Sequence, residues 1–200
     1  MTVRSIAFGV LAVLAAAGSG AEAPEPLRYR FDPARSVLRW ELPATLHTVR
    51  GVAPRFEGFV QADPQPGGGF DVEARITVNA ASMNTGNAKR DRTMREKVLE
   101  TERHPEIVFE LERFTGPVSR MRTGENFTAR IEGKLTIHGH TEPVLLPVDV
   151  HVFEDHAIVT GSFPVHWKKY GLADPSFGLV KVKEPLQVVF RLRAVPESPR

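Results

Sequence analysis

Long runs of strict apolar–polar alternation are the feature that most constrains the fold of this chain. In residues 70–79, every second residue from Phe70 to Val78 is apolar, and the residues between them are polar. A two-residue period predicts a β-strand with one dry face and one wet face. Similar runs cover residues 36–42, 56–61, 107–114, 127–138, 144–152, 157–165 and 186–193. The sequence therefore predicts an all-β fold of about eight strands.

The spacing of these strands favours an antiparallel β-barrel over a sandwich. No alternation of strands with helices points to a parallel sheet. The strands are long, and only one segment is able to cover an open end. A barrel of about eight strands is either filled by side chains or holds one small ligand. Small residues on the apolar faces leave room inside or only permit close packing, and the pattern leaves both readings open: Gly58, Ala74, Ala129, Gly133, Ala157 and Gly161.

One short helix is predicted between the strands, within residues 82–109. Asn87 follows a turn-forming stretch and is a suitable N-cap. The helix is predicted to run from near Asn87 to about Glu102, with a narrow apolar stripe that includes Met94 and Val98. Pro105 is expected to end it, because the residue before a proline avoids the α region. A lone helix with so thin an apolar face is typical of a plug or lid on a barrel.

Composition and charge exclude several functional classes. The chain has 200 residues, of which 42% are hydrophobic and 25% charged, which suits one well-cored domain. The net charge is only +2 and the two signs are interspersed, so no nucleic-acid partner is predicted. Cysteine is absent, which excludes disulfides, thiolate metal sites, cysteine nucleophiles and lipid attachment through an N-terminal cysteine.

Residues 1–23 have the pattern of a cleaved signal peptide. Arg4 precedes an apolar run from Ile6 to Ala17 that is too short to span a bilayer comfortably. Small residues then permit cleavage after Ala21 or after Ala23, and an uncleaved membrane anchor is the alternative. We therefore expect residues 24–200 to form a single domain that is periplasmic or secreted.

Several short motifs, in order, resemble the signature of the YceI-like family. They extend from about Tyr29 to Ala194, and each is weak alone, but their order and spacing are specific. The motifs are Phe31-Asp32-Pro33-Ala34-Arg35-Ser36, Val49-Arg50-Gly51, Ser82-Met83-Asn84-Thr85-Gly86, Arg90-Asp91, His104-Pro105-Glu106-Ile107-Val108-Phe109 and the run from Gly133 to Val144.

The resemblance implies a lipocalin-like, extended antiparallel β-barrel. Members of the family are typically secreted or periplasmic, and several carry a long apolar chain, such as a polyisoprenoid or a fatty amide, inside the barrel. This chain departs from the commonest form of the family at residues 93–99 and 165–176. Both stretches are expected near the mouth of a ligand site.

A carrier of this kind would bind its ligand mainly by burying apolar surface, since each methylene taken from water contributes about 0.8 kcal/mol. Arg90, Arg92 and Arg95 could meet an anionic head group, with a solvated charged face as the alternative, or structural contacts of Arg90. The apolar strand faces supply the expected ligand-binding residues: Trp40, Phe56, Val60, Val72, Ile76, Phe109, Phe127, Ala129, Ile131, Leu135, Phe163, Val188 and Phe190.

Metal-dependent and hydrolytic chemistry are not predicted. A metal site would rest on His138 and His140, with His151 and His156 further along, but the family motif accounts for the first pair without a metal. The chain has no Gly-x-Ser-x-Gly elbow and no phosphate-binding glycine loop before a helix. No cofactor, metal or catalytic residue is therefore expected.

The sequence thus predicts a non-catalytic binding protein with a long-chain apolar or amphiphilic ligand in its interior. A polyisoprenoid, an isoprenoid quinone or a fatty amide would suit the apolar faces. The alternative is a filled-core barrel of the cell envelope that serves as a structural or protein-interaction module. Transient contact with a membrane and a homodimer are compatible with either reading.

Overall fold

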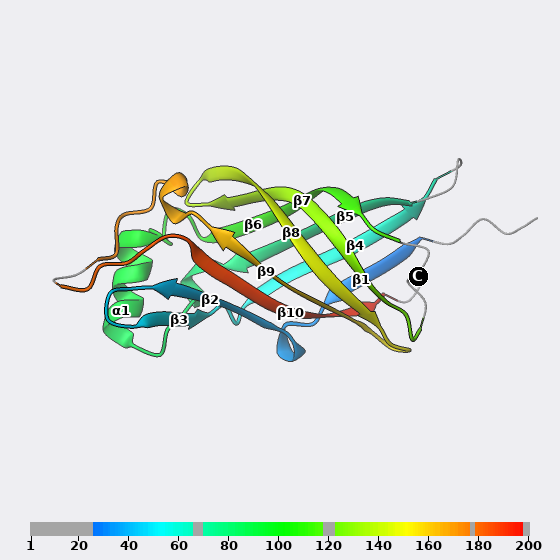
Figure 1. Cartoon of the computed structure of the whole chain (residues 1–200), viewed down its shortest axis with the longest axis horizontal. Helices are drawn as coiled ribbons and strands as arrows, with labels where there is room; N and C mark the ends of the chain where they lie inside the picture. The colour runs from blue at the N-terminus through cyan, green and yellow to red at the C-terminus, as the bar shows by residue number, and fades with distance from the viewer. Residues whose placement is uncertain (1–25, 66–69, 118–122, 177–178, 198–200) are drawn as a thin grey trace, which may run out of the picture.

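The alternating runs form one antiparallel sheet that closes on itself, as the computed structural model of the chain shows (Figure 1). The structure describes residues 26–65, 70–117, 123–176 and 179–197. The expected signal peptide and both of its cleavage positions lie outside these residues. No helix in the described ranges is long and apolar enough to cross a membrane.

The predicted antiparallel β-barrel is confirmed. Among the described residues, eight strands form the closed ring in the order β1-β4-β5-β6-β7-β8-β9-β10, and β2 and β3 extend the sheet beside β10. The strands are β1 (Leu27–Phe31), β2 (Val37–Pro43), β3 (Thr48–Val52), β4 (Phe56–Pro64), β5 (Phe70–Asn79), β6 (Glu106–Thr115), β7 (Asn126–Ile137), β8 (His140–Val152), β9 (Ala157–Val165) and β10 (Leu186–Pro196). The short helices within the described ranges are α1 (Ala88–Thr93), a π-helical turn (Met94–Val98) and 3₁₀ turns at Pro33–Arg35, Ala80–Ser82 and Trp167–Tyr170.

The chain breaks its strand between β1 and β2, and both strands pair with the same edge of β10. The last residues of β10 pair with β1, whereas Gln187–Arg191 pair with β2. Asp32 and Ser36 flank the break: the Asp32 side chain accepts a hydrogen bond from the Ala34 amide, and the Ser36 hydroxyl accepts one from the Arg193 amide at 2.9 Å. Residues 31–36, the first of the family-like motifs, therefore form a hydrogen-bonded corner of the barrel.

The helix begins where the sequence predicts and ends earlier. The Asn87 side chain accepts a hydrogen bond from the Arg90 amide at 3.1 Å, which makes Asn87 the N-cap. The helical turns stop at Val98 instead of about Glu102. Glu100 has φ 45°, which an α-helix cannot accommodate, so Glu100 and not Pro105 ends the helix.

The barrel has two ends with different coverings (Figure 1). We call the end that carries α1, the loop of the β2–β3 hairpin and residues 166–176 and 179–185 the helix end. The opposite end, where β1 begins and β10 finishes, is the far end. Asn84 ties the segment before α1 to the wall, because its amide and carbonyl both bond the backbone of Val52.

Candidate functional site

A large apolar cavity occupies the helix end of the barrel. Its volume is about 950 Å³, near the upper limit of typical small-molecule sites. The strands provide its walls, and the helical segment and residues 172–176 contribute to its lining at the helix end. Its lining is overwhelmingly apolar: Leu38, Trp40, Leu42, Val49, Ala53, Ile76, Val78, Met83, Met94, Val98, Leu99, Ile107, Phe109, Ile131, Leu135, Ile137, Leu146, Val148, Val159, Phe163, Val165, Trp167, Leu172, Ala173, Pro175, Val180, Val182, Leu186, Val188, Phe190 and Leu192.

The polar groups of the lining are few and mostly basic. Only one carboxylate, that of Asp174, is present among the described residues of the lining. The polar lining consists of Arg39, His47, Asn87, Lys89, Arg90, Thr93, Lys97, Asp174 and Ser176. A basic rim around an apolar interior is suited to an amphiphile whose head group carries negative charge or hydrogen-bond acceptors.

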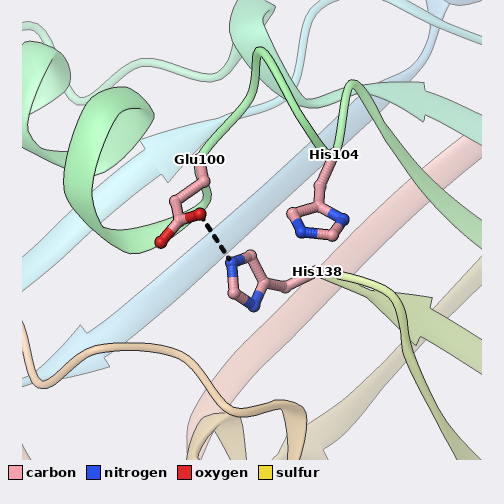
Figure 2. A group of neighbouring side chains, drawn as sticks. All are labelled: Glu100, His104 and His138. Carbon is pink, nitrogen blue, oxygen red and sulfur yellow. Dashed lines mark ion pairs between the residues drawn. The ribbon is translucent and has the colours of Figure 1, made fainter.

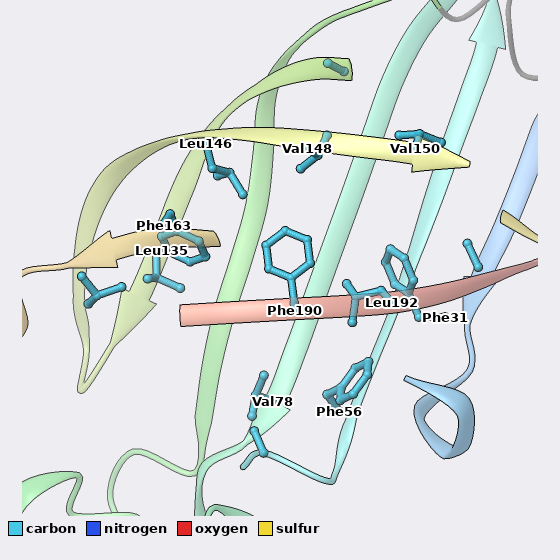
Figure 3. Close-up of a cluster of buried hydrophobic side chains, with 14 of the residues drawn as sticks. Phe31, Phe56, Val78, Leu135, Leu146, Val148, Val150, Phe163, Phe190 and Leu192 are labelled. Carbon is cyan, nitrogen blue, oxygen red and sulfur yellow. The ribbon is translucent and has the colours of Figure 1, made fainter. Parts of the chain in front are cut away.

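The structure divides the predicted ligand-binding residues into two groups. Those that line the cavity are Trp40, Ile76, Phe109, Ile131, Leu135, Phe163, Val188 and Phe190. Those outside its lining are Phe56, Val60, Val72, Phe127 and Ala129. In the second group, Phe127 and Ala129 are buried in the packed core, and Val60 packs against it. Phe56 is also buried in that core (Figure 3).

Small residues on the inner face do not enlarge the cavity. A Cβ added at Gly133 would lie 2.7 Å from a ring carbon of Phe109, and one added at Gly161 would lie 2.6 Å from a ring carbon of Phe190. The two glycines therefore accommodate phenylalanine rings of neighbouring strands. Of the two readings that the pattern left open, close packing is the one that applies to these positions.

Two tryptophans of the cavity lining have buried, unpaired hydrogen-bond donors. The indole of Trp40 lies over Gly51 on the paired strand β3, where any side chain would collide with the ring. Trp167 begins the 3₁₀ turn after β9 and is 4% exposed. Both Nε1 atoms are buried and have no acceptor among the described residues. Since an unpaired buried donor costs about 1–3 kcal/mol, a ligand oxygen that accepts from either indole would gain affinity.

The predicted head-group arginines have separate environments. Arg90 lines the cavity, but its Nε donates to the Thr85 hydroxyl at 2.8 Å, and its Nη2 donates to the Thr85 carbonyl. The buried Asp91 accepts from the amide and the hydroxyl of the same Thr85. This network orders the turn before α1, so Arg90 has a structural contact. Arg92 and Arg95 are not in the lining.

Sequence reasoning missed Lys89 and Lys97, which line the cavity from α1 and the π-helical turn. It also missed the contribution of β3, because residues 46–51 alternate poorly. Residues 172–176 also line the cavity, although none of them was among the predicted ligand-binding residues. Both stretches that depart from the family's form, 93–99 and 165–176, contribute lining residues.

Burial also affects the ionisation of a tyrosine near this end. Tyr170 is 2% exposed at the end of the 3₁₀ turn that begins with Trp167. Removal from water, with a smaller contribution from the Glu142 carboxylate, raises the pKa of Tyr170 to about 12. Its phenol therefore stays neutral at physiological pH.

One group of described side chains outside the cavity lining could hold a metal ion. Glu100, His104 and His138 meet beside the end of the helical segment (Figure 2). His140, the expected partner of His138, is not part of this group.

Comparison with known proteins agrees with the fold. A family model described as the YceI-like domain matches residues 29–194. No curated protein matches the sequence significantly. Residues of this chain superpose on Burkholderia cenocepacia BcnA with a TM-score of 0.68 at 20% identity, covering 82% of this chain and 99% of that one.

Two further solved structures have the same fold. A polyisoprenoid binding domain from Saccharophagus degradans, implicated in plant cell wall breakdown, matches with a TM-score of 0.70 at 17% identity, covering 86% of this chain and 99% of that one. The Campylobacter jejuni YCEI protein matches with a TM-score of 0.55 at 14% identity, covering 78% and 88%. At such identities the likeness concerns the fold alone.

Proposed function

The chain belongs to the YceI-like family, and on that premise we propose that it is a non-catalytic, periplasmic or secreted carrier of one long-chain amphiphile. The cargo is a polyisoprenoid, an isoprenoid quinone or a fatty amide, with its apolar chain in the cavity at the helix end. The observation that carries the proposal is the cavity of about 950 Å³ with its almost wholly apolar wall.

Burial of the chain supplies the affinity in this proposal. Each methylene moved from water into the cavity contributes about 0.8 kcal/mol, less the cost of ordering the chain. Several isoprene units would therefore suffice for tight binding without any charged contact. The polyisoprenoid binding domain from Saccharophagus degradans has the same fold, which makes such a cargo a reasonable first choice.

The polar lining suggests how the head group is held. Trp40 and Trp167 line the cavity, and a rotation of either indole toward it would let the unpaired N–H group donate to a carbonyl, hydroxyl or phosphate oxygen. Lys89 and Lys97 add positive charge at the rim. An acceptor-rich head group, and above all an anionic one, therefore fits this rim better than a cationic one.

The alternative of a filled core accounts for only part of the molecule. Phe127, Ala129 and Val150 do fill the far end of the barrel. The cavity at the other end is inconsistent with a filled interior along the whole barrel, so we favour the carrier.

Native mass spectrometry of protein secreted from a Gram-negative host, followed by solvent extraction, tests this function. We expect one additional mass per chain that extracts into organic solvent, and a mature N-terminus at Glu22 or Pro24. The matched variants are Val188→Phe, which places a ring in the cavity, and Leu145→Phe, which adds the same ring at a residue that is 58% exposed. A bare polypeptide mass that stays unchanged after incubation with isoprenoid quinones, polyprenyl phosphates and fatty amides would overturn the proposal.

A further inference from the structure

Two histidines and one glutamate from separate loops converge at the helix end, outside the cavity lining. Glu100 and His104 belong to the loop that joins the π-helical turn to β6, and His138 lies in the tight turn between β7 and β8. One ligand atom from each residue lies within 4.8 Å of the others. Figure 2 shows the three side chains turned toward one another.

We propose that Glu100, His104 and His138 form a binding site for a divalent cation of the Zn²⁺ class. Two imidazole nitrogens and one carboxylate oxygen are ligands that Zn²⁺ and its neighbours in the first transition row prefer, and a fourth position stays open for water. Zn–N and Zn–O bonds of about 2.0–2.2 Å place tetrahedral ligands roughly 3.4 Å apart. The Glu100 Oε2 and His138 Nε2 atoms are 3.8 Å apart, so only a small movement is needed to bring this pair together.

The polar atoms of His138 provide a second observation. Both of its ring nitrogens are buried and have no hydrogen-bond partner among the described residues. A buried imidazole without any partner is costly, and metal coordination through one nitrogen would satisfy it. The ring of His104 lies against it, with the two centroids 4.3 Å apart.

The backbone of the site is held in an uncommon conformation. Glu100 has φ 45° and His138 has φ 53°, and they are the positive-φ non-glycine residues of the described chain. Such conformations cost free energy and concentrate at functional sites. Gly139 has φ 75°, and a Cβ there would lie 3.3 Å from the His104 ring, so the glycine leaves room for that imidazole.

The competing explanation is an ordinary ion pair. Arg103 donates to Glu100 Oε2 at 2.9 Å, and this contact would weaken the carboxylate as a ligand. The Arg103 side chain is 76% exposed, so it can turn to solvent at little cost when a cation arrives. An ion pair with Glu100 also does not explain why the other ring nitrogen of His138 is buried without a partner, or why His104 lies next to this pair.

Occupancy of this site would brace the wall of the cavity. Glu100 follows Leu99, and His138 follows Ile137, and both of these apolar residues line the cavity. A cation bound to the three side chains would tie the end of the helical segment to the β7–β8 turn. The site itself does not depend on the identity, or even the presence, of a cargo.

Zinc titration of the full chain, purified without a histidine tag and stripped with a chelator, tests the proposal. We expect one equivalent of Zn²⁺ by calorimetry, and a rise in Tm of about 5–10 °C at a hundredfold excess over Kd. Bound Co²⁺ should give the visible absorption of a four- or five-coordinate site.

Three variants decide the outcome. His138→Asn removes the imidazole and keeps a residue type that tolerates positive φ, and His104→Gln removes the second imidazole at ordinary backbone geometry. Each should weaken Zn²⁺ binding by more than the 10–100-fold typical of an outer-shell loss. His151→Asn, at an exposed position of β8, is the control and should bind as the unchanged protein does. No zinc binding, or equal binding by His104→Gln and the control, would overturn the site even if His138→Asn failed to fold.

Discussion

The two ends of the barrel use the same strand pattern and fill their interiors differently. At the far end, Phe127 and Val152 are buried in one cluster with alanines such as Ala157 and Ala194, and none of these residues lines the cavity. At the helix end, Trp40, Ile131 and Val188 face the cavity and are only half-buried, although they point inward. Inward direction and burial are therefore separate properties in this barrel.

The two ends differ in which side chains fill the interior of the barrel. At the far end, alanines such as Ala157 and Ala194 belong to the same buried hydrophobic cluster as the ring of Phe127, so the interior there is closely packed. The helix end is covered by loops and one short helix instead, and many of its aliphatic residues line the cavity. A packed far end can thus supply stability while the helix end provides space for a ligand.

Truncating a phenylalanine side chain should give the largest difference in stability between the two ends of the barrel. Phe127→Ala removes a ring that is 8% exposed from the packed end, and we expect a loss of about 3–5 kcal/mol in the free energy of unfolding. Phe109→Ala removes the same ring from the cavity wall and should cost about 1–3 kcal/mol, because one side of the ring already lacks neighbours. Urea unfolding measures both, and equal losses would contradict the distinction between a filled and a hollow end.

Enlargement of a side chain should also cost more stability at the packed far end than in the cavity. Ala129→Phe adds a ring at a position that is 4% exposed and should destabilise by at least about 1–3 kcal/mol through overpacking. Val188→Phe places the ring in the cavity, should change stability by less than about 1 kcal/mol, and should sharply reduce uptake of the cargo. Unfolding curves and native mass spectra of both variants provide the comparison. Full uptake of the cargo by Val188→Phe would show that the cargo does not bind in this cavity.

Charge substitutions should sharpen the assignment of the rim. Lys89→Gln with Lys97→Gln removes two charges from the cavity lining, whereas Arg92→Gln with Arg95→Gln removes two charges from the same helical segment outside it. The first pair should weaken binding of a polyprenyl phosphate about 5-fold, as expected of about 1 kcal/mol from partly exposed charges. Binding of an uncharged polyprenol should not change. Equal effects of the two pairs would indicate a general attraction without a defined head-group site.

The chain has two tyrosines, one at each end of the barrel, so their titration measures burial at the two ends separately. Burial raises the pKa of Tyr29 at the far end, and raises the pKa of Tyr170 at the helix end to about 12. Since the folded-state pKa of Tyr170 exceeds the unfolded value of about 10, its neutral form stabilises the fold fully below pH 10, and this contribution is lost as the pH rises from about 10 to 12. Tyr170→Phe should therefore lose less stability over that interval. Ultraviolet titration and urea unfolding at both pH values test this, and an unshifted Tyr170 titration would exclude it.

The sequence predicted much of the molecule because the relevant signals are local. The alternation in residues 70–79 specifies which side chains point inward along β5, and Asn87 specifies where α1 begins. Local signals also have limits. The helix ends at Val98 because Glu100 takes a positive φ. A glutamate does not by itself favour a positive φ, so the sequence has no local signal for this end of the helix.

The sequence by itself predicted β2 and β4–β10, the faces of those strands and an antiparallel barrel, since a two-residue period and turn residues act over a few neighbouring positions. It did not predict β1 or β3. Only the tertiary structure decided which end is hollow. Phe127 and Phe109 are equivalent in any pattern, yet one is packed and the other lines the cavity, because packing depends on side chains that arrive from distant strands. The meeting of His104 with His138 has the same cause: two separate turns come together only when the barrel closes.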